Sequence, residues 1–129
     1  MPYEVTVKGH FSAAHNLREY KGECEQLHGH NWNVDLVIAG DELNREGMLI
    51  DFKAVKQILG EVTGRFDHRY LNDVPPFDLL NPSCENLARV VAEAVAARLP
   101  RGMRVSAVTA WESDRCAVTY RPPAPEKEA

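Results

Sequence analysis

Residues 28–39 read HGHNWNVDLVIA, and apolar and polar side chains alternate along this stretch. One face carries Trp32, Val34, Leu36 and Ile38, and the other carries Asn31, Asn33 and Asp35. A period of two residues predicts a β-strand with one buried face. His28 and His30 fall in phase with the apolar row, so we expect both imidazoles at one end of the core-facing side of this strand.

The remaining elements follow from the same kind of pattern. Alternation predicts further strands at residues 3–12, 103–111 and 115–121, the last two paired as a hairpin. Helical spacing of apolar residues predicts one helix after Asp51 and another after Ser83, both good N-cap residues. The order strand, strand, helix, helix, strand, strand (ββααββ) predicts an α+β domain, with a four-stranded antiparallel sheet and two helices on one face. Such a sheet has two open edges, which assembly could cover.

The composition is that of one globular domain. The chain has 129 residues, of which 44% are hydrophobic, and a formal net charge of −4. This charge argues against a general nucleic-acid binder, and no apolar run is long enough to span a membrane. With no signal peptide, we expect a cytoplasmic protein with reduced thiols. Residues 1–121 are predicted to form the domain, and 122–129, PPAPEKEA, a disordered tail.

A third histidine changes what the first two can do. His28 and His30 alone could be surface histidines on a loop. His15, however, follows the first predicted strand, and a short loop returns the chain to His28. If the two strands pair as a hairpin, the three histidines meet at one end of the sheet. Three histidines with one open position are typical of catalytic zinc sites.

The three cysteines differ in their surroundings. Cys24 lies four residues before His28 and could be a fourth ligand, a nucleophile or base, or an inert thiol. Cys116 is in phase with Val118 and Tyr120, which predicts a buried structural thiol. Cys84 falls in the first turn of the second helix, and its role stays open.

Two acidic positions also carry possible chemistry. Asp67 and His68 are adjacent, and such a pair can act as a proton relay or form a surface ion pair. Alternation places Met103, Val105, Ala107 and Trp111 on one face of their strand. Glu112 should therefore face the side opposite Trp111, where its carboxylate could bind an amidine-like group or remain exposed.

These landmarks together resemble the 6-pyruvoyltetrahydropterin synthase / 6-carboxytetrahydropterin synthase family over nearly the whole chain. The matching segments, in order, are FSAAH (11–15), CEQLHGH (24–30), GMLIDF (47–52), DHRYLN (67–72), PSCEN (82–86) and Glu112. The resemblance implies a zinc ion bound by His15, His28 and His30. It implies Cys24 as the catalytic proton acceptor, with Asp67 and His68 as its relay. It implies pterin contacts from Glu112, Ser83, Cys84 and Glu85, although Cys84 stands where the family usually has Thr or Ser.

The resemblance also implies an overall architecture and an activity. The family has the tunnelling fold, forms homohexamers as dimers of trimers, and places its active sites between subunits. Its substrate is 7,8-dihydroneopterin triphosphate. The compact length favours the branch that makes 6-carboxy-5,6,7,8-tetrahydropterin, a zinc-dependent lyase reaction that releases acetaldehyde and triphosphate in queuosine biosynthesis. The alternatives are a pyruvoyl-type synthase, a zinc-stabilised binding module and a zinc hydrolase. Arg18 and Lys21 are candidate contacts to the triphosphate.

Overall fold

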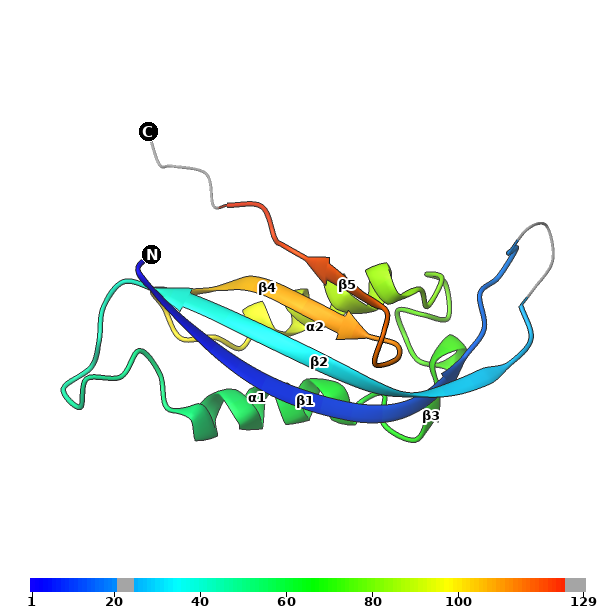
Figure 1. Cartoon of the computed structure of the whole chain (residues 1–129), viewed down its shortest axis with the longest axis horizontal. Helices are drawn as coiled ribbons and strands as arrows, with labels where there is room; N and C mark the ends of the chain where they lie inside the picture. Colours follow the sequence, from blue (N-terminus) through cyan, green and yellow to red (C-terminus); the bar gives the residue numbers. More distant parts are fainter. Residues whose placement is uncertain (21–24, 125–129) are drawn as a thin grey trace.

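The computed structural model describes residues 1–20 and 25–124 and confirms the predicted α+β class. Its elements are β1 (Tyr3–His15), β2 (His28–Gly40), α1 (Phe52–Gly64), β3 (Arg69–Tyr70), a 3-10 turn (Leu71–Asp73), α2 (Cys84–Ala96), β4 (Met103–Trp111) and β5 (Ala117–Tyr120). The sheet has five strands in the order β3-β1-β2-β4-β5, one more than predicted (Figure 1). The additional strand, β3, has two residues, too few to show a period, and pairs in parallel with β1.

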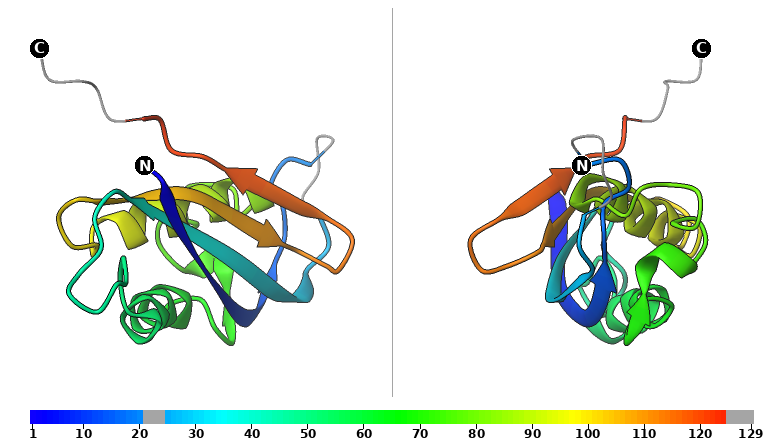
Figure 2. Two further views of the ribbon diagram at one scale, coloured as in Figure 1. Left: turned by 60° about the vertical axis from the view of Figure 1, so that its left-hand side comes forward. Right: turned by 90° about the vertical axis from the view of Figure 1, so that its right-hand side faces the viewer.

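Both helices cover the same face of the sheet (Figure 2). Each begins at the predicted cap: Asp51 accepts a hydrogen bond from the backbone N–H of Lys53, and Ser83 from that of Asn86. The core lies between the sheet and the helices. Within it the rings of Phe11 and Trp32 stack with centroids 6.0 Å apart. No helix among the described residues is long and apolar enough to cross a membrane.

The pairing of β1 with β2 confirms the predicted hairpin. The strands are antiparallel, and their register places His15 opposite His28 and Ala13 opposite His30. Opposed residues in an antiparallel pair point to the same side of the sheet. The register of two alternating strands therefore gathers the three histidines at one end of the helix-covered face.

A β-bulge in β4 changes which residues face the helices. Val37 pairs with Ala107 but Ile38 pairs with Val105, so Ser106 is an extra residue in β4. A bulge reverses the alternation of the strand that contains it. The prediction that Trp111 shares a face with Val105 is therefore wrong. Trp111 points to the face turned away from the helices, where its indole N–H donates to Asp35 at 3.0 Å. Glu112 accordingly continues the helix-facing row.

Arg18 ties the loop after β1 to the segment that precedes α2. Its guanidinium donates to the backbone carbonyl oxygens of Asn72, Phe77 and Leu80 at 3.1, 2.6 and 3.2 Å. Its backbone N–H also donates to the side chain of Asn81 at 2.8 Å. The guanidinium therefore binds this chain's own carbonyls, which does not support the predicted contact to triphosphate. Lys21 lies outside the described residues.

Replacing Arg18 with methionine is expected to lower the free energy of unfolding. The variant keeps the aliphatic stem but leaves three carbonyl oxygens without their charged donor. We expect a loss of about 2–4 kcal/mol in chemical denaturation. The same change at Arg89, an exposed residue of α2, should have an effect of less than about 0.5 kcal/mol. Equal losses for both variants would contradict a clamping role for Arg18.

The predicted domain boundary stays a prediction. Strand β5 ends at Tyr120, and residues 122–124 belong to no helix or strand. Residues 125–129 of the predicted tail lie outside the described residues.

Candidate metal centre and active site

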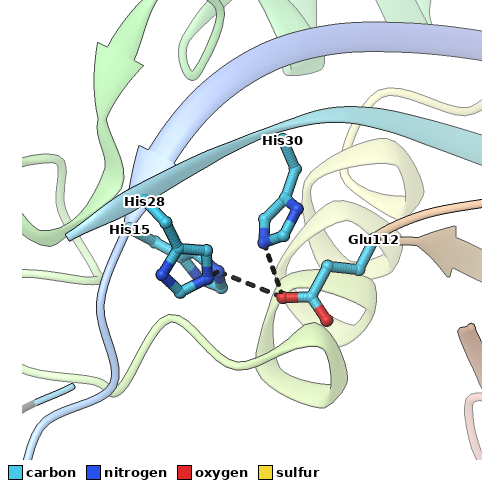
Figure 3. A group of neighbouring side chains, drawn as sticks. All are labelled: His15, His28, His30 and Glu112. Atoms are coloured by element: carbon cyan, nitrogen blue, oxygen red, sulfur yellow. Dashed lines mark hydrogen bonds and ion pairs between the residues drawn. The ribbon is translucent and has the colours of Figure 1, made fainter. Parts of the chain in front are cut away.

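Four side chains point toward one another at one end of the sheet (Figure 3). They are His15 from β1, His28 and His30 from β2, and Glu112, which directly follows β4. One donor atom from each lies within 4.8 Å of all the others. His15 Nε2 lies 3.1 Å from His28 Nε2, while Glu112 Oε1 lies 3.1 Å from His15 Nε2 and 3.0 Å from His30 Nε2. The predicted histidine trio is thus brought together, and a carboxylate joins it.

The hydrogen bonds behind two of the rings determine which nitrogen faces the centre as an acceptor. His15 Nδ1 lies 2.8 Å from the carbonyl oxygen of Pro82, and His28 Nδ1 lies 2.8 Å from that of Gln26. A carbonyl oxygen can only accept, so both Nδ1 atoms carry hydrogen. In the neutral rings both Nε2 atoms then present lone pairs. Backbone carbonyls orient metal-binding histidines in this way in many proteins.

The lone pairs and the carboxylate within this cluster favour binding of a cation. When both rings are neutral, the lone pairs of His15 Nε2 and His28 Nε2 face each other at 3.1 Å, with the Glu112 carboxylate beside them. His30 Nε2 is buried without a hydrogen-bond partner, and its nearest charged neighbour is Glu112 Oε1 at 3.0 Å. Such an arrangement is repulsive without a positive ion at its middle. Three imidazole nitrogens and a carboxylate oxygen therefore fit a metal ion.

The surroundings of His30 favour the neutral, metal-binding form of its ring. Burial lowers the pKa of His30, and the neighbouring His15 and His28 lower it further, against an opposing effect of Glu112. A neutral imidazole is the form that binds metal, since a proton on Nε2 would occupy the ligand position. The lowered pKa of His30 thus agrees with the metal-binding arrangement of the donor atoms.

The start of α2 lies beside this cluster. The carbonyl of Pro82 holds His15, and the Cys84 thiol donates to the carbonyl oxygen of Ala110 at 3.1 Å, two residues before Glu112. Ser83 caps the helix, and Glu85 is exposed in its first turn. The structure therefore brings the predicted segment 83–85 close to the histidine cluster, while its contacts to a pterin stay a prediction.

The two described cysteines have opposite environments. Burial raises the pKa of Cys84 to about 11, and the negative charges of Glu112 and Glu85 act in the same direction. Cys116, which was expected to be buried, is exposed. The prediction is wrong because β5 begins only at Ala117, so Cys116 belongs to the preceding turn, where its carbonyl accepts from the backbone N–H of Glu112.

Alkylation with iodoacetamide at neutral pH should distinguish these two thiols. Thiolate is the reactive form, so we expect Cys116 to be modified at least about tenfold faster than the protonated, half-buried Cys84. Peptide mapping by mass spectrometry measures both rates in one sample, and Cys116→Ser removes the fast one. Comparable rates at the two sites in the folded protein would refute the assigned environments.

Asp67 and His68 form the predicted pair, and neither belongs to the cluster of three histidines and Glu112. Asp67 Oδ1 lies 3.0 Å from His68 Nδ1 and accepts from the backbone N–H of Ser12 at 2.9 Å. These bonds hold the pKa of Asp67 below its usual value, that from Ser12 being the larger cause. The backbone N–H of His68 donates to the Ser12 carbonyl at 2.6 Å. The pair is thus anchored to β1 three residues before His15.

The side chain of His68 is directed toward solvent. It is 83% exposed, and its backbone has a φ of 58°, in the left-handed region that few non-glycine residues adopt. It lines a hollow together with Gly29, His30 and Asn31. Within the described part of the chain, no hydrogen bond or ion pair joins Asp67 or His68 to the three histidines. Cys24 lies outside the described residues, so its catalytic role stays a prediction.

Comparisons of sequence and of structure with known proteins point to the same family. The sequence model of the family described as 6-pyruvoyl tetrahydropterin synthase matches residues 4–123. The 6-carboxy-5,6,7,8-tetrahydropterin synthase of Bacillus subtilis is 36% identical over 102 residues, which cover 75% of this chain and 68% of the relative. The dihydroneopterin monophosphate aldolase of Pyrococcus furiosus is 29% identical over 118 residues, or 92% and 96% of the two chains. The 6-pyruvoyl tetrahydropterin synthase of Caenorhabditis elegans shares the fold, with a TM-score of 0.81 at 24% identity over 94% of this chain and 96% of that one.

Proposed function

Because the chain belongs to the 6-pyruvoyl tetrahydropterin synthase family, we propose that it is a cytoplasmic, zinc-dependent 6-carboxy-5,6,7,8-tetrahydropterin synthase. It would convert 7,8-dihydroneopterin triphosphate to 6-carboxytetrahydropterin, acetaldehyde and triphosphate in queuosine biosynthesis. The observation that carries the proposal is the convergence of three histidine Nε2 atoms beside the start of α2. The similarity to the Bacillus subtilis enzyme supports this product over the pyruvoyl product.

Each proposed residue has a distinct task in this reaction. His15, His28 and His30 would hold Zn²⁺, with the carbonyls of Pro82 and Gln26 orienting two of the rings. When bound, Zn²⁺ supplies Lewis-acid polarisation of the substrate's side-chain oxygens. Cys24 would accept the proton that this polarisation acidifies, and Asp67 would orient His68 for its transfer.

Substrate recognition would rest on Glu112 and on the start of α2. A carboxylate can accept two parallel hydrogen bonds from the amidine-like edge of a pterin, which gives orientation as well as affinity. Ser83, Cys84 and Glu85 would line the same pocket. Cys84 would contribute a thiol wall rather than a nucleophile, since its thiol is protonated at neutral pH and donates to Ala110.

The position of the Asp67–His68 pair supports active sites shared between copies of the chain. The pair is anchored at Ser12 on the edge of β1 and faces solvent, while the metal cluster lies on the helix-covered face. We propose that each pair serves the metal centre of a neighbouring subunit in a homohexamer. The sheet edges at β3 and β5 leave backbone groups that such an assembly could pair.

Product analysis with 7,8-dihydroneopterin triphosphate tests the proposed activity. We expect the mass of 6-carboxytetrahydropterin together with acetaldehyde. A pyruvoyl product without acetaldehyde, or turnover of the monophosphate instead, would overturn the proposal in favour of a relative's activity. Cys24→Ala should lower the rate by about 10²–10⁴-fold with the metal content unchanged. Cys116→Ala, which alters an exposed thiol, is the matched control. An unchanged rate in Cys24→Ala would contradict the proposed role of Cys24 as proton acceptor, whereas the absence of any product from the wild type would favour a binding module.

A further inference from the structure

We propose that Glu112 acts as a gate, binding either the metal ion or the pterin ring but not both, so that pterin binding opens the fourth metal position. This inference rests on the proposed function and concerns the order of events at the same site. It starts from the position of the Glu112 carboxylate, which does not point toward an empty pocket. Its Oε1 lies instead among the donor atoms of the three histidines.

The four donors are enough in number for a complete tetrahedral ligand set. Oε1 lies 3.1 Å from His15 Nε2 and 3.0 Å from His30 Nε2. Ligands of a tetrahedral zinc ion, at about 2.0–2.1 Å from the metal, are about 3.3 Å apart. These two contacts are close to that value, and all the donor atoms lie within 4.8 Å of one another. A set of four protein ligands is closed, as in structural sites, whereas a catalytic zinc keeps one position for substrate. Of the four, the carboxylate is the ligand that has a second use in this enzyme.

Oε1 cannot serve both partners in this position. A bidentate contact to a pterin requires both carboxylate oxygens to face the ring. Here Oε1 makes both contacts drawn in Figure 3, and the second oxygen makes neither. A planar pterin edge could reach Oε1 only if the carboxylate turned away from the two imidazoles. Binding the ring and binding the metal are therefore alternatives for this side chain.

The structure leaves Glu112 free to make this movement. The backbone at this position is held, since the N–H of Glu112 donates to the Cys116 carbonyl at 3.1 Å. The side chain is 34% exposed, compared with 2% for His15. The three histidines, by contrast, lie on paired strands, and two of them are oriented by carbonyls. Rotation of one glutamate side chain is thus the smallest change that opens the ligand set.

The gate has a thermodynamic consequence that can be measured. If metal and pterin compete for Glu112, bound pterin must weaken metal binding, and by linkage the metal must weaken pterin binding by the same factor. The natural substrate would mask this weakening of metal binding, because its side-chain hydroxyls can replace the Glu112 carboxylate as a metal ligand. A pterin without such hydroxyls leaves the weakening measurable. We therefore choose 6-methylpterin as the probe.

The test uses the full-length protein loaded with Co²⁺, whose visible absorption reports its ligands. We expect saturating 6-methylpterin to change this spectrum and to increase metal loss to a chelator by about tenfold. In Glu112→Gln, 6-methylpterin should change neither the Co²⁺ spectrum nor the loss of metal to the chelator. Asp114→Asn removes an exposed carboxylate two residues away and should behave like the wild type.

The outcomes separate the gate from the proposed function. Quenching of pterin fluorescence measures 6-methylpterin binding independently of the metal. If the probe binds while the Co²⁺ spectrum and the metal affinity stay constant, the gate is overturned and the proposed function stands. If the probe does not bind at all, the proposed function fails and the gate with it. The wild-type comparison decides the question even if Glu112→Gln does not fold.

Discussion

Replacing His30 with alanine is expected to remove the metal and nearly all activity while leaving the fold intact. The variant deletes one of three nitrogen donors, and the Glu112 carboxylate loses its 3.0 Å neighbour. Lewis-acid catalysis contributes several kcal/mol, so we expect kcat/KM to fall by about 10³-fold or more. Metal analysis after dialysis against a chelator, together with product formation, measures both effects.

His30 suits this experiment better than His15 does. The His30 side chain is 22% exposed, whereas His15 is almost fully buried and bonds to Pro82 through Nδ1. The matched control is His10→Ala, an exposed histidine of β1 outside the cluster, which should keep both metal and activity. Full metal content and an unchanged rate in His30→Ala would show that the cluster is not the metal centre.

The histidine trio could be predicted because it depends on local patterns. Alternation along β1 and β2 determines which side chains share a face, and the short connection between the strands makes them neighbours. The caps Asp51 and Ser83 are equally local, because a side-chain oxygen bonds to an N–H two or three residues later. Such features need no knowledge of distant contacts.

The position of Glu112 could not be predicted in this way. Its face depends on the bulge at Ser106, and the bulge appears only when β4 pairs with Val37 and Ile38 of β2. The alternation of β4 alone therefore assigned the wrong core face, although it correctly separated Glu112 from Trp111. A bulge depends on how two strands pair, and no single residue of β4 predicts it.

Two other features also depend on distant parts of the chain. The sequence predicts a ligand contact for Arg18, because an arginine in a loop gives no sign of its partners within the chain. Its three carbonyl acceptors lie more than 50 positions further along the chain. The alternation of β5 predicts a core position for Cys116 only if it is extended two residues beyond the strand, into a turn. Strand ends and long-range polar contacts are set by tertiary packing.

Mixing two inactive variants is expected to restore activity if active sites are shared between subunits. The partners are His30→Ala, which lacks a metal ligand, and His68→Ala, which lacks the relay and should lose about 10²-fold in rate. The two residues belong to separate clusters in one chain, since His68 is anchored through Asp67 to Ser12 and faces solvent. A site built from the histidines of one subunit and the relay of another can be intact in a mixed oligomer.

The expected recovery follows from random assembly of the two variants, co-expressed in equal amounts with different tags. Half of the metal centres are intact, and half of these meet an intact relay, so about one quarter of the sites should work. The matched control mixes His30→Ala with Glu112→Gln, whose altered residues lie in the same cluster 3.0 Å apart. This control should recover nothing, because every site carries one of the two lesions. The mixture of His30→Ala with His68→Ala could instead show no more activity than the separate variants. Each subunit must then supply its own relay. The solvent-facing His68 side chain would have to turn toward the metal centre of its own subunit during the reaction.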